Sequence, residues 1–339
     1  MTDASAARSQ PSSPQVISAS YRTDIPALYG DWFMERVREG YVRYYNPYGP
    51  QVVSVSLQPQ DVHAIVFWSK NYAPFMRHLD ELEQRNLDFY FHFSINGYTA
   101  DPAVRPLEER VPHPTQSIKV FRELATRYSP KHVQWRYDPI IYTDRTDEQW
   151  HMRTFAKLAR QLEGLTERCY FSFLDIYDKV ARNMRGLDQA LRLRDRSDEE
   201  KRQLALELAR IAENHGITLY TCAEDFAAIG PIKRGACVDK DILDAFWPHK
   251  ARAMKLCSNR GKCGCYDSRD IGAYDTCPLG CVYCYAVLNR PLALKRYREH
   301  DPHHDALIKR GPKEPPAHTL AHNEIIQPEL PLNDDSNDR

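Results

Sequence analysis

Residues 64–96 read AIVFWSKNYAPFMRHLDELEQRNLDFYFHFSIN, and this stretch decides the fold class. It begins with the apolar run 64–68 and ends with the apolar and aromatic run 87–95, and both have the composition of buried strands. Between them, residues 73–84 carry apolar side chains three or four positions apart, which is the spacing of one face of a helix. A strand, a helix and a second strand in this order predict two parallel strands with the helix packed outside the sheet.

The same alternation of strand and helix extends in both directions along the chain. Four more strands are predicted at residues 16–20, 132–137, 169–176 and 217–222. Helical patterns occur at residues 32–39, 115–128, 148–163 and 199–215. No glycine-rich dinucleotide fingerprint follows the first strand, which argues against an open dinucleotide-binding sheet. We therefore expect an α/β fold, a complete or partial TIM-type (β/α) barrel, over residues 15–308.

Composition and the two ends of the chain limit the functional classes. Residues 1–14 and 309–339 are polar and rich in Ser, Pro, Asn and Asp, so we expect them to be disordered. The 46 basic and 46 acidic residues cancel, so no overall basicity points to nucleic acid. No apolar run is long enough for a membrane span or a secretory signal, which predicts a cytoplasmic protein without membrane contact. Nine cysteines in that compartment are expected to be reduced thiols, metal ligands or catalysts.

The strongest local motif is Cys277-Pro-Leu-Gly-Cys281-Val-Tyr-Cys284, with the spacing C-x3-C-x2-C. Thiolates are soft ligands that suit iron–sulfur clusters and zinc. Structural zinc sites usually combine cysteine pairs or add histidines, and simple ferredoxins use four local cysteines. Three thiolates from one loop instead predict a [4Fe–4S] cluster with one iron left open for substrate chemistry.

This spacing, with Tyr283 directly before the third cysteine, resembles the signature of the radical S-adenosylmethionine superfamily. The resemblance implies that the open iron binds the amino and carboxylate groups of S-adenosylmethionine. It also implies reductive cleavage of this cofactor to a 5′-deoxyadenosyl radical that acts on an unknown substrate. An electron donor such as a flavodoxin or a ferredoxin would be a partner.

A broader resemblance covers roughly residues 16–290. The segments VFWSKNYAPF, WRYDPI, YTCAED, GACVDKD and CGCYDSRDIGAYDTC resemble, in order, the family called domain of unknown function 1848. Its members look like radical enzymes with the cluster motif near the C-terminus. In the superfamily the cysteine loop normally follows the first strand, whereas here it follows the last strand candidate, residues 270–273. The resemblance therefore implies a circularly permuted barrel, in which residues 270–273 pair with the first strand and the cysteine loop opens at the carboxyl ends of the strands.

Polar residues follow the predicted strands, where barrel enzymes place their catalytic groups. The permuted order would put Arg22 and Asp24 near the cofactor. The candidate cofactor contacts are Tyr283, Arg22, Asp24 and Asn96. The candidate catalytic residues are Arg22, Asp24, Arg136, Asp138 and Glu224. The alternative is that these strands simply become polar as they emerge into solvent.

Four other cysteines, Cys222, Cys237, Cys263 and Cys265, have no single motif. A Cys-Gly-Cys turn such as 263–265 can wrap a metal, with Gly264 relieving the tight backbone. The four form either an auxiliary iron–sulfur cluster or a set of reduced, partly buried thiols, and both interpretations stay open.

The tail segment QPELPL, from Gln327 to Leu332, resembles the short peptides by which bacterial DNA-repair and replication proteins bind the sliding clamp. Proline replaces the usual leucine at its second position, and a disordered tail with scattered leucines is the favoured interpretation. The leading function is a radical enzyme with an unknown substrate. The alternatives are a non-catalytic or redox-sensing iron–sulfur protein, and a nucleic-acid-modifying or DNA-repair-associated radical enzyme.

Overall fold

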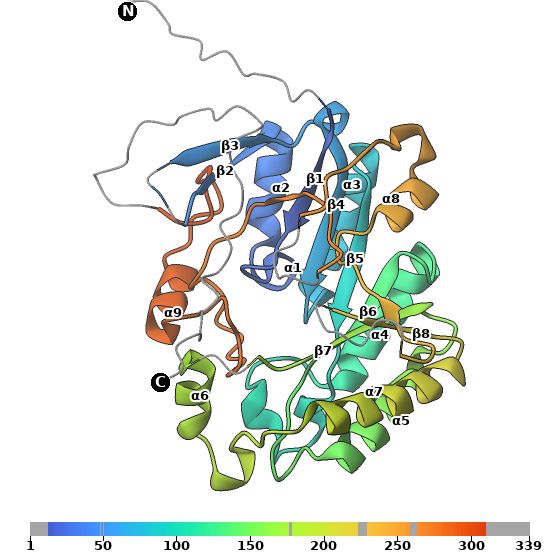
Figure 1. Ribbon diagram of the computed structural model, residues 1–339. Helices are drawn as coiled ribbons and strands as arrows, with labels where there is room; N and C mark the ends of the chain where they lie inside the picture. The colour runs from blue at the N-terminus through green and yellow to red at the C-terminus, as the bar shows by residue number, and fades with distance from the viewer. Residues whose placement is uncertain are drawn as a thin grey trace, which may run out of the picture.

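The computed structural model describes residues 13–47, 49, 51–175, 178–222, 229–257 and 263–309. Its centre is one sheet of eight strands in the order β10-β1-β4-β5-β6-β7-β8-β9, and every neighbouring pair is parallel (Figure 1). The strands are β1 (Gln15–Ala19), β4 (Val62–Ser69), β5 (Phe89–Ser94), β6 (Val133–Ile140), β7 (Arg168–Phe173), β8 (Thr218–Thr221), β9 (Lys233–Arg234) and β10 (Arg269–Asp270). All six strands predicted from the sequence are present, which confirms the α/β class.

Helices lie between the strands, and the five predicted helical segments are confirmed. They are α2 (Gly30–Glu39), a 3₁₀ segment (Ala73–His78) leading into α3 (Leu79–Gln84), α4 (Pro114–Arg127), α5 (Glu148–Leu162) and α7 (Asp198–Glu213). Local signals fix their starts: Asp147 accepts a hydrogen bond from the Trp150 N–H at α5, and Ser197 forms a capping box with Glu200 at α7. Further helices are α1 (Ile25–Leu28), α6 (Asp178–Arg185), α8 (Lys240–Phe246) and α9 (Arg290–Arg298).

Both faces of the sheet are covered, as parallel strands require. On one face, Phe67 and Phe91 join a large core with side chains of α2, α3, α4, α5 and α7. On the other face, Val66 and Tyr90 pack against Leu243 of α8. Figure 1 shows α2 and α8 on opposite sides of β1 and β4. The second face is therefore covered near the amino ends of the strands, which leaves their carboxyl ends for a site.

The end of the chain returns to its beginning within the sheet. β10 pairs in parallel with β1, with Ile17 opposite Arg269 and Ser18 opposite Asp270. This confirms the predicted pairing of the last strand candidate with the first strand, although β10 covers only Arg269–Asp270. In the part of the chain that the structure describes, no hydrogen-bonded pairing joins β10 to β9. The architecture is thus a parallel α/β sheet flanked by helices, in which the strands form an open row.

An antiparallel hairpin, β2 (Tyr41–Tyr45) with β3 (Val52–Ser56), was not expected from the sequence. Residues 1–12 and 310–339 lie outside the described residues, and with them the clamp-like segment from Gln327 to Leu332. Within the described residues, no helix is both long and apolar enough to cross a membrane.

Candidate functional site

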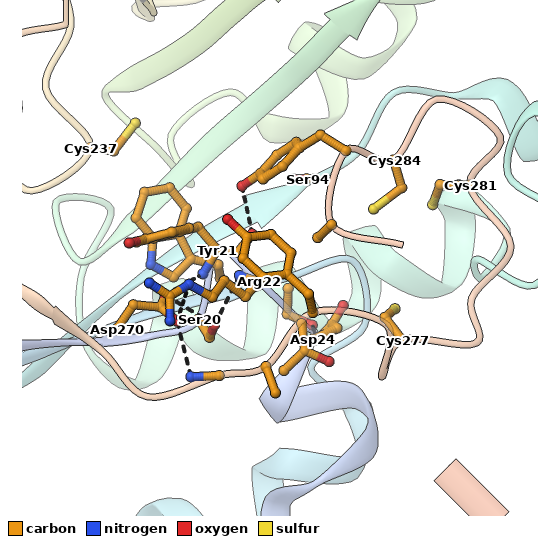
Figure 2. Close-up of a pocket in the computed structure, with 18 of the residues that line it drawn as sticks. Ser20, Tyr21, Arg22, Asp24, Ser94, Cys237, Asp270, Cys277, Cys281 and Cys284 are labelled. Atoms are coloured by element: carbon orange, nitrogen blue, oxygen red, sulfur yellow. Dashed lines mark hydrogen bonds and ion pairs between the residues drawn. The ribbon is translucent and has the colours of Figure 1, made fainter. Parts of the chain in front are cut away.

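A cavity of about 900 Å³ opens at the carboxyl ends of the parallel strands. Its walls come from residues at or beyond the carboxyl ends of β1, β4, β6, β7, β8 and β10, and from the loop that carries Cys277, Cys281 and Cys284. Figure 2 shows these three cysteines on one side of the cavity and Cys237 on the other. The predicted opening of the cysteine loop at this edge of the sheet is confirmed. The volume lies at the upper end for small-molecule sites, which leaves room for a cofactor and a substrate together.

The three-cysteine loop is held against the segment that precedes α4. The Arg110 N–H donates to the Leu279 carbonyl at 3.0 Å, and the Val282 N–H donates to the Leu107 carbonyl at 3.1 Å. Gly280 has a φ of +80°, a left-handed conformation that lets the chain turn between the first two cysteines. These contacts fix the backbone of the loop, so its three thiols share one wall of the cavity.

Two thiols of this loop, those of Cys277 and Cys281, would carry charge only at a cost. Burial raises the pKa of Cys277, and the carboxylate of Asp24 and the other two thiols raise it further. Burial also raises the pKa of Cys281, while the ammonium group of Lys70 opposes this rise. Thiolates at Cys277 and Cys281 therefore need positive charge beside them. This donor set fits a group that brings that charge, as iron does, and soft thiolates are the ligands of iron–sulfur clusters.

One buried carboxylate ties the loop to the sheet. Glu108, 2% exposed, accepts hydrogen bonds from Lys70 Nζ at 2.8 Å and Asn96 Nδ2 at 3.0 Å, and it also accepts one from the Tyr283 hydroxyl. Asn96 is fixed in turn, since its Nδ2 donates to the Asp138 carbonyl at 3.0 Å and its Oδ1 accepts from the Asp138 N–H at 2.8 Å. Asn96 and Tyr283, both predicted from the sequence, are thus brought together. Glu108 was missed, because it lies in a turn rather than at a strand end.

Asp24 has a structural role at the start of α1. Its carboxylate accepts hydrogen bonds from Ser69 Oγ at 2.6 Å, the Lys70 N–H at 2.8 Å and the Ala27 N–H at 3.0 Å. Burial raises its pKa to about 6, although these three donors oppose the rise. Asp24 borders the cavity next to Cys277, so its hydrogen bonds join β1, β4 and the edge of the cysteine site.

Arg22 lies at the end of β1, above a second buried carboxylate. Asp270 accepts hydrogen bonds from the hydroxyl groups of Ser18 and Ser20 and from the N–H groups of Tyr21 and Gly272, at 2.8 to 3.0 Å. Its Oδ1 is 3.8 Å from Arg22 Nε. The Arg22 guanidinium also lies over the rings of Tyr21, Tyr44 and Tyr274, at 5.5 to 5.9 Å from their centroids. Arg22 therefore presents a positive charge to the cavity. The carboxylate of Asp270, which lies beside this charge, is itself fixed by hydrogen bonds from four residues.

Arg136 and Asp138 occupy the middle of the cavity wall. The Arg136 guanidinium pairs with Asp138, donates to Cys237 Sγ at 3.0 Å, and lies 5.3 Å from the centroid of the Trp68 ring. Asp138 also accepts a hydrogen bond from the Ser172 hydroxyl. Both residues face the cavity, as predicted, and Arg136 links the sheet to the second group of cysteines.

The four cysteines of the second group meet at the cavity. Cys222 Sγ is 3.7 Å from Cys237 Sγ, and Cys265 Sγ accepts a hydrogen bond from the Cys237 N–H at 3.1 Å. The thiol of Cys265 also forms a hydrogen bond with that of Cys263. Hydrogen bonds with Cys222 and Cys265 lower the pKa of Cys237, which favours the thiolate form. Among the described residues, no three side chains of His, Cys, Asp or Glu form a ready-made site for one metal ion.

Two residues lie apart from this site. Glu224 lies outside the described residues, so its role stays a prediction. Cys169 lies in β7 within the main apolar core.

Comparison with known proteins identifies one family. The family model described as Domain of unknown function (DUF1848) matches residues 16–286. The matched region includes every strand of the parallel sheet except the first residue of β1, and it includes all three cysteines of the loop. A search of curated proteins finds no match.

Proposed function

The chain belongs to the DUF1848 family, and we propose that it is a radical S-adenosylmethionine enzyme with a [4Fe–4S] cluster on Cys277, Cys281 and Cys284. One observation carries the proposal: three thiols from one short loop line a cavity at the carboxyl ends of parallel strands. Barrel-type enzymes place their chemistry at this edge. Three protein thiolates would leave one iron of the cluster for a small ligand.

The residues around the loop suit an anionic cluster. Lys70 stands beside Cys281 and forms an ion pair with Glu108. Because this pair is largely buried, solvent would screen the Lys70 ammonium group only weakly from the sulfur atoms. Arg22 adds a second positive charge at the cavity wall. When bound, the cluster would supply the electron that cleaves S-adenosylmethionine and yields a 5′-deoxyadenosyl radical.

The other side chains would bind, orient and exchange protons. Arg22 is suited to an anionic carboxylate, because its guanidinium is buried and faces the cavity. Tyr283 would line the cofactor side, and Asn96, which is buried behind the cavity wall, would act through Glu108, which holds both in place. Arg136 and Asp138 would contact the substrate or move a proton, since they lie at the cavity between the two groups of cysteines. Asp24 would position Ser69 and the start of α1.

The pairing of β10 with β1 supports a finer proposal about the fold. We infer that the sheet is a partial barrel of the radical S-adenosylmethionine type, circularly permuted so that its cysteine loop comes last. β10 would then take the place of the strand that the loop normally follows, and β1 would be its neighbour. A flavodoxin or a ferredoxin would supply electrons.

The direct test uses anaerobically reconstituted protein, dithionite and S-adenosylmethionine. We expect 5′-deoxyadenosine and methionine as products, even without a substrate, and no products from the C277A/C281A/C284A variant. Cys169→Ala is the matched control, because Cys169 lies in the core away from the cavity. Methylthioadenosine would contradict cleavage to the 5′-deoxyadenosyl radical. The absence of both products, with four irons bound to the loop, would favour a redox-sensing or non-catalytic protein instead.

A further inference from the structure

The geometry points to a second iron–sulfur cluster, held by Cys222, Cys237, Cys263 and Cys265 in the cavity wall across from the three-cysteine loop. This inference deepens the proposed function, because it adds an electron-carrying centre to the same cavity. It depends on a separate set of thiols, so it can fail or stand independently of the first cluster.

Three distant segments bring these cysteines together. Cys222 follows β8, where its N–H donates to the Phe171 carbonyl at 2.9 Å. Cys237 follows β9, and its own N–H donates to Cys265 Sγ at 3.1 Å. The third segment is tied to the second, because the Tyr266 N–H donates to the Val238 carbonyl at 3.0 Å. The convergence of the sulfur atoms therefore rests on backbone hydrogen bonds and not on loose side chains.

Two glycines permit this close approach. A Cβ atom on Gly235 would lie 2.5 Å from the Thr221 carbonyl oxygen, and a Cβ atom on Gly264 would lie 2.9 Å from the Gly235 carbonyl oxygen. Neither contact is tolerable for a backbone neighbour. The Gly235 N–H also donates to the Thr221 carbonyl at 2.8 Å. The two glycines thus let the segments that carry Cys237, Cys263 and Cys265 stack against the end of β8.

Polar groups fix Cys237 from the side of the sheet. Its carbonyl accepts a hydrogen bond from the Tyr90 hydroxyl at 2.7 Å and lies 2.7 Å from His92 Nε2. Its sulfur accepts a hydrogen bond from Arg136 at 3.0 Å. Hydrogen bonds to ligating sulfur atoms are a main control on the reduction potential of iron–sulfur clusters. A positive charge beside the sulfur is suited to a centre that gains an electron.

Three simpler interpretations fit these contacts less well. Reduced structural thiols pack within an apolar core, as Cys169 does, whereas these four line a cavity and contact one another. A disulfide between Cys222 and Cys237 would use two of the four thiols and leave Cys263 and Cys265 unexplained. A single zinc ion usually takes paired C-x2-C ligands, and this spacing does not occur among them.

A four-iron cluster is larger than one ion, so the sulfur atoms of Cys222 and Cys237, which lie 3.7 Å apart, would move apart when the cluster binds. Four cysteines are the usual ligand set of a [4Fe–4S] cluster. With all four irons held by protein, no iron would be open to S-adenosylmethionine. The second centre would therefore exchange electrons with the cavity and would not bind the cofactor.

The test counts iron and sulfide after anaerobic reconstitution with ferrous iron and sulfide. We expect about eight of each per chain for the wild type, about four for C277A/C281A/C284A, about four for C222S/C237S, and about eight for the C169A control. Total iron of about four that disappears entirely in C277A/C281A/C284A would overturn the inference. One tightly bound zinc lost in C222S/C237S, or a Cys222–Cys237 disulfide found by mass spectrometry, would overturn it as well.

Electron paramagnetic resonance distinguishes this result from misfolding and from failure of the proposed function. In reduced C277A/C281A/C284A, we expect the signal of one cluster that does not change when S-adenosylmethionine is added. A signal that changes would overturn the assignment of four protein ligands. If C277A/C281A/C284A loses no iron while C222S/C237S loses about four, the proposed function fails and the second cluster stands.

Discussion

Replacing Glu108 with glutamine tests the buried network beneath the cysteine loop. The carboxylate is 2% exposed and accepts hydrogen bonds from three donors, one of which is the ammonium group of Lys70. Glutamine preserves the shape of the side chain but removes its charge. Its amide oxygen can still accept the three hydrogen bonds, because all three donors reach the same carboxylate oxygen. The substitution therefore leaves a charged, largely buried Lys70 without its counterion.

The expected loss follows from the burial of the pair. Removing one partner of a buried ion pair destabilises a protein by about 3 to 5 kcal/mol. The side chain of Lys70 is 14% exposed, so water can reach part of its charge. We therefore place the loss near the lower end, at about 3 kcal/mol. Replacing Lys70 with methionine in the E108Q background should recover much of this loss, because no unpaired charge remains.

Urea unfolding of the apoprotein under reducing conditions measures this effect through the free energy of unfolding. Asp144→Asn is the matched control: it neutralises a carboxylate in the exposed pair with Arg194, where both side chains are nearly half exposed. The control should leave the unfolding midpoint nearly unchanged, since solvent screens exposed pairs. The reasoning is refuted if E108Q shifts the midpoint no more than D144N does, or if K70M worsens E108Q.

Two further predictions concern packing and pH. Gly235→Ala should lower the free energy of unfolding by about 1 to 3 kcal/mol, because its Cβ would lie 2.5 Å from the Thr221 carbonyl oxygen, whereas Gly186→Ala meets nothing closer than 3.6 Å and should be neutral in the same urea titration. Burial lowers the pKa of His151 from 6.5 to about 4, so the unfolded chain takes up a proton first as the pH falls. The contribution of His151 to the free energy of unfolding is fully present above pH 6.5. It should decrease by up to about 3 kcal/mol as the pH falls to 4. His151→Gln should flatten this acid limb in unfolding curves, and an unchanged limb would assign it to other groups.

The sheet could be predicted from the sequence because parallel strands buried on both faces appear as continuous apolar runs. Residues 64–68 and 87–95 have this property, and both match strands of the structure. The hairpin of β2 and β3 was missed even though YVRYY and VVSVS have strand composition. Each run is only five residues long and has exposed or half-exposed positions, so its apolar pattern is weaker than that of the buried strands. The turn residues between the two runs were an available signal.

The site could be predicted only in part. The three cysteines of the loop are adjacent in sequence, so their spacing alone identifies them as a group. Glu108 carried no such signal, because its partners Lys70 and Tyr283 are 38 and 175 residues away. Asp270 was expected only as the start of a strand, yet it accepts hydrogen bonds from four residues around the end of β1. Buried carboxylates of this kind cannot be recognised in the sequence, because the groups that donate hydrogen bonds to them come together only in the tertiary structure.

The site joins the two ends of the folded region, and this has a consequence for how the cavity forms. Ser20 and Asp270 are hydrogen-bonded across 250 residues of sequence, and the Tyr29 hydroxyl donates to the Thr276 carbonyl across 247. Contacts of such separation form late, because the chain between their ends must be ordered first. The strands β4 to β8 can pair with near neighbours in sequence, but β1 gains its second partner only when β10 arrives. We therefore expect the wall that carries Cys277, Cys281 and Cys284 to be added to a sheet that already presents Arg22, Lys70 and Arg136. A cluster bound to that wall would stabilise the contact on which the cavity depends.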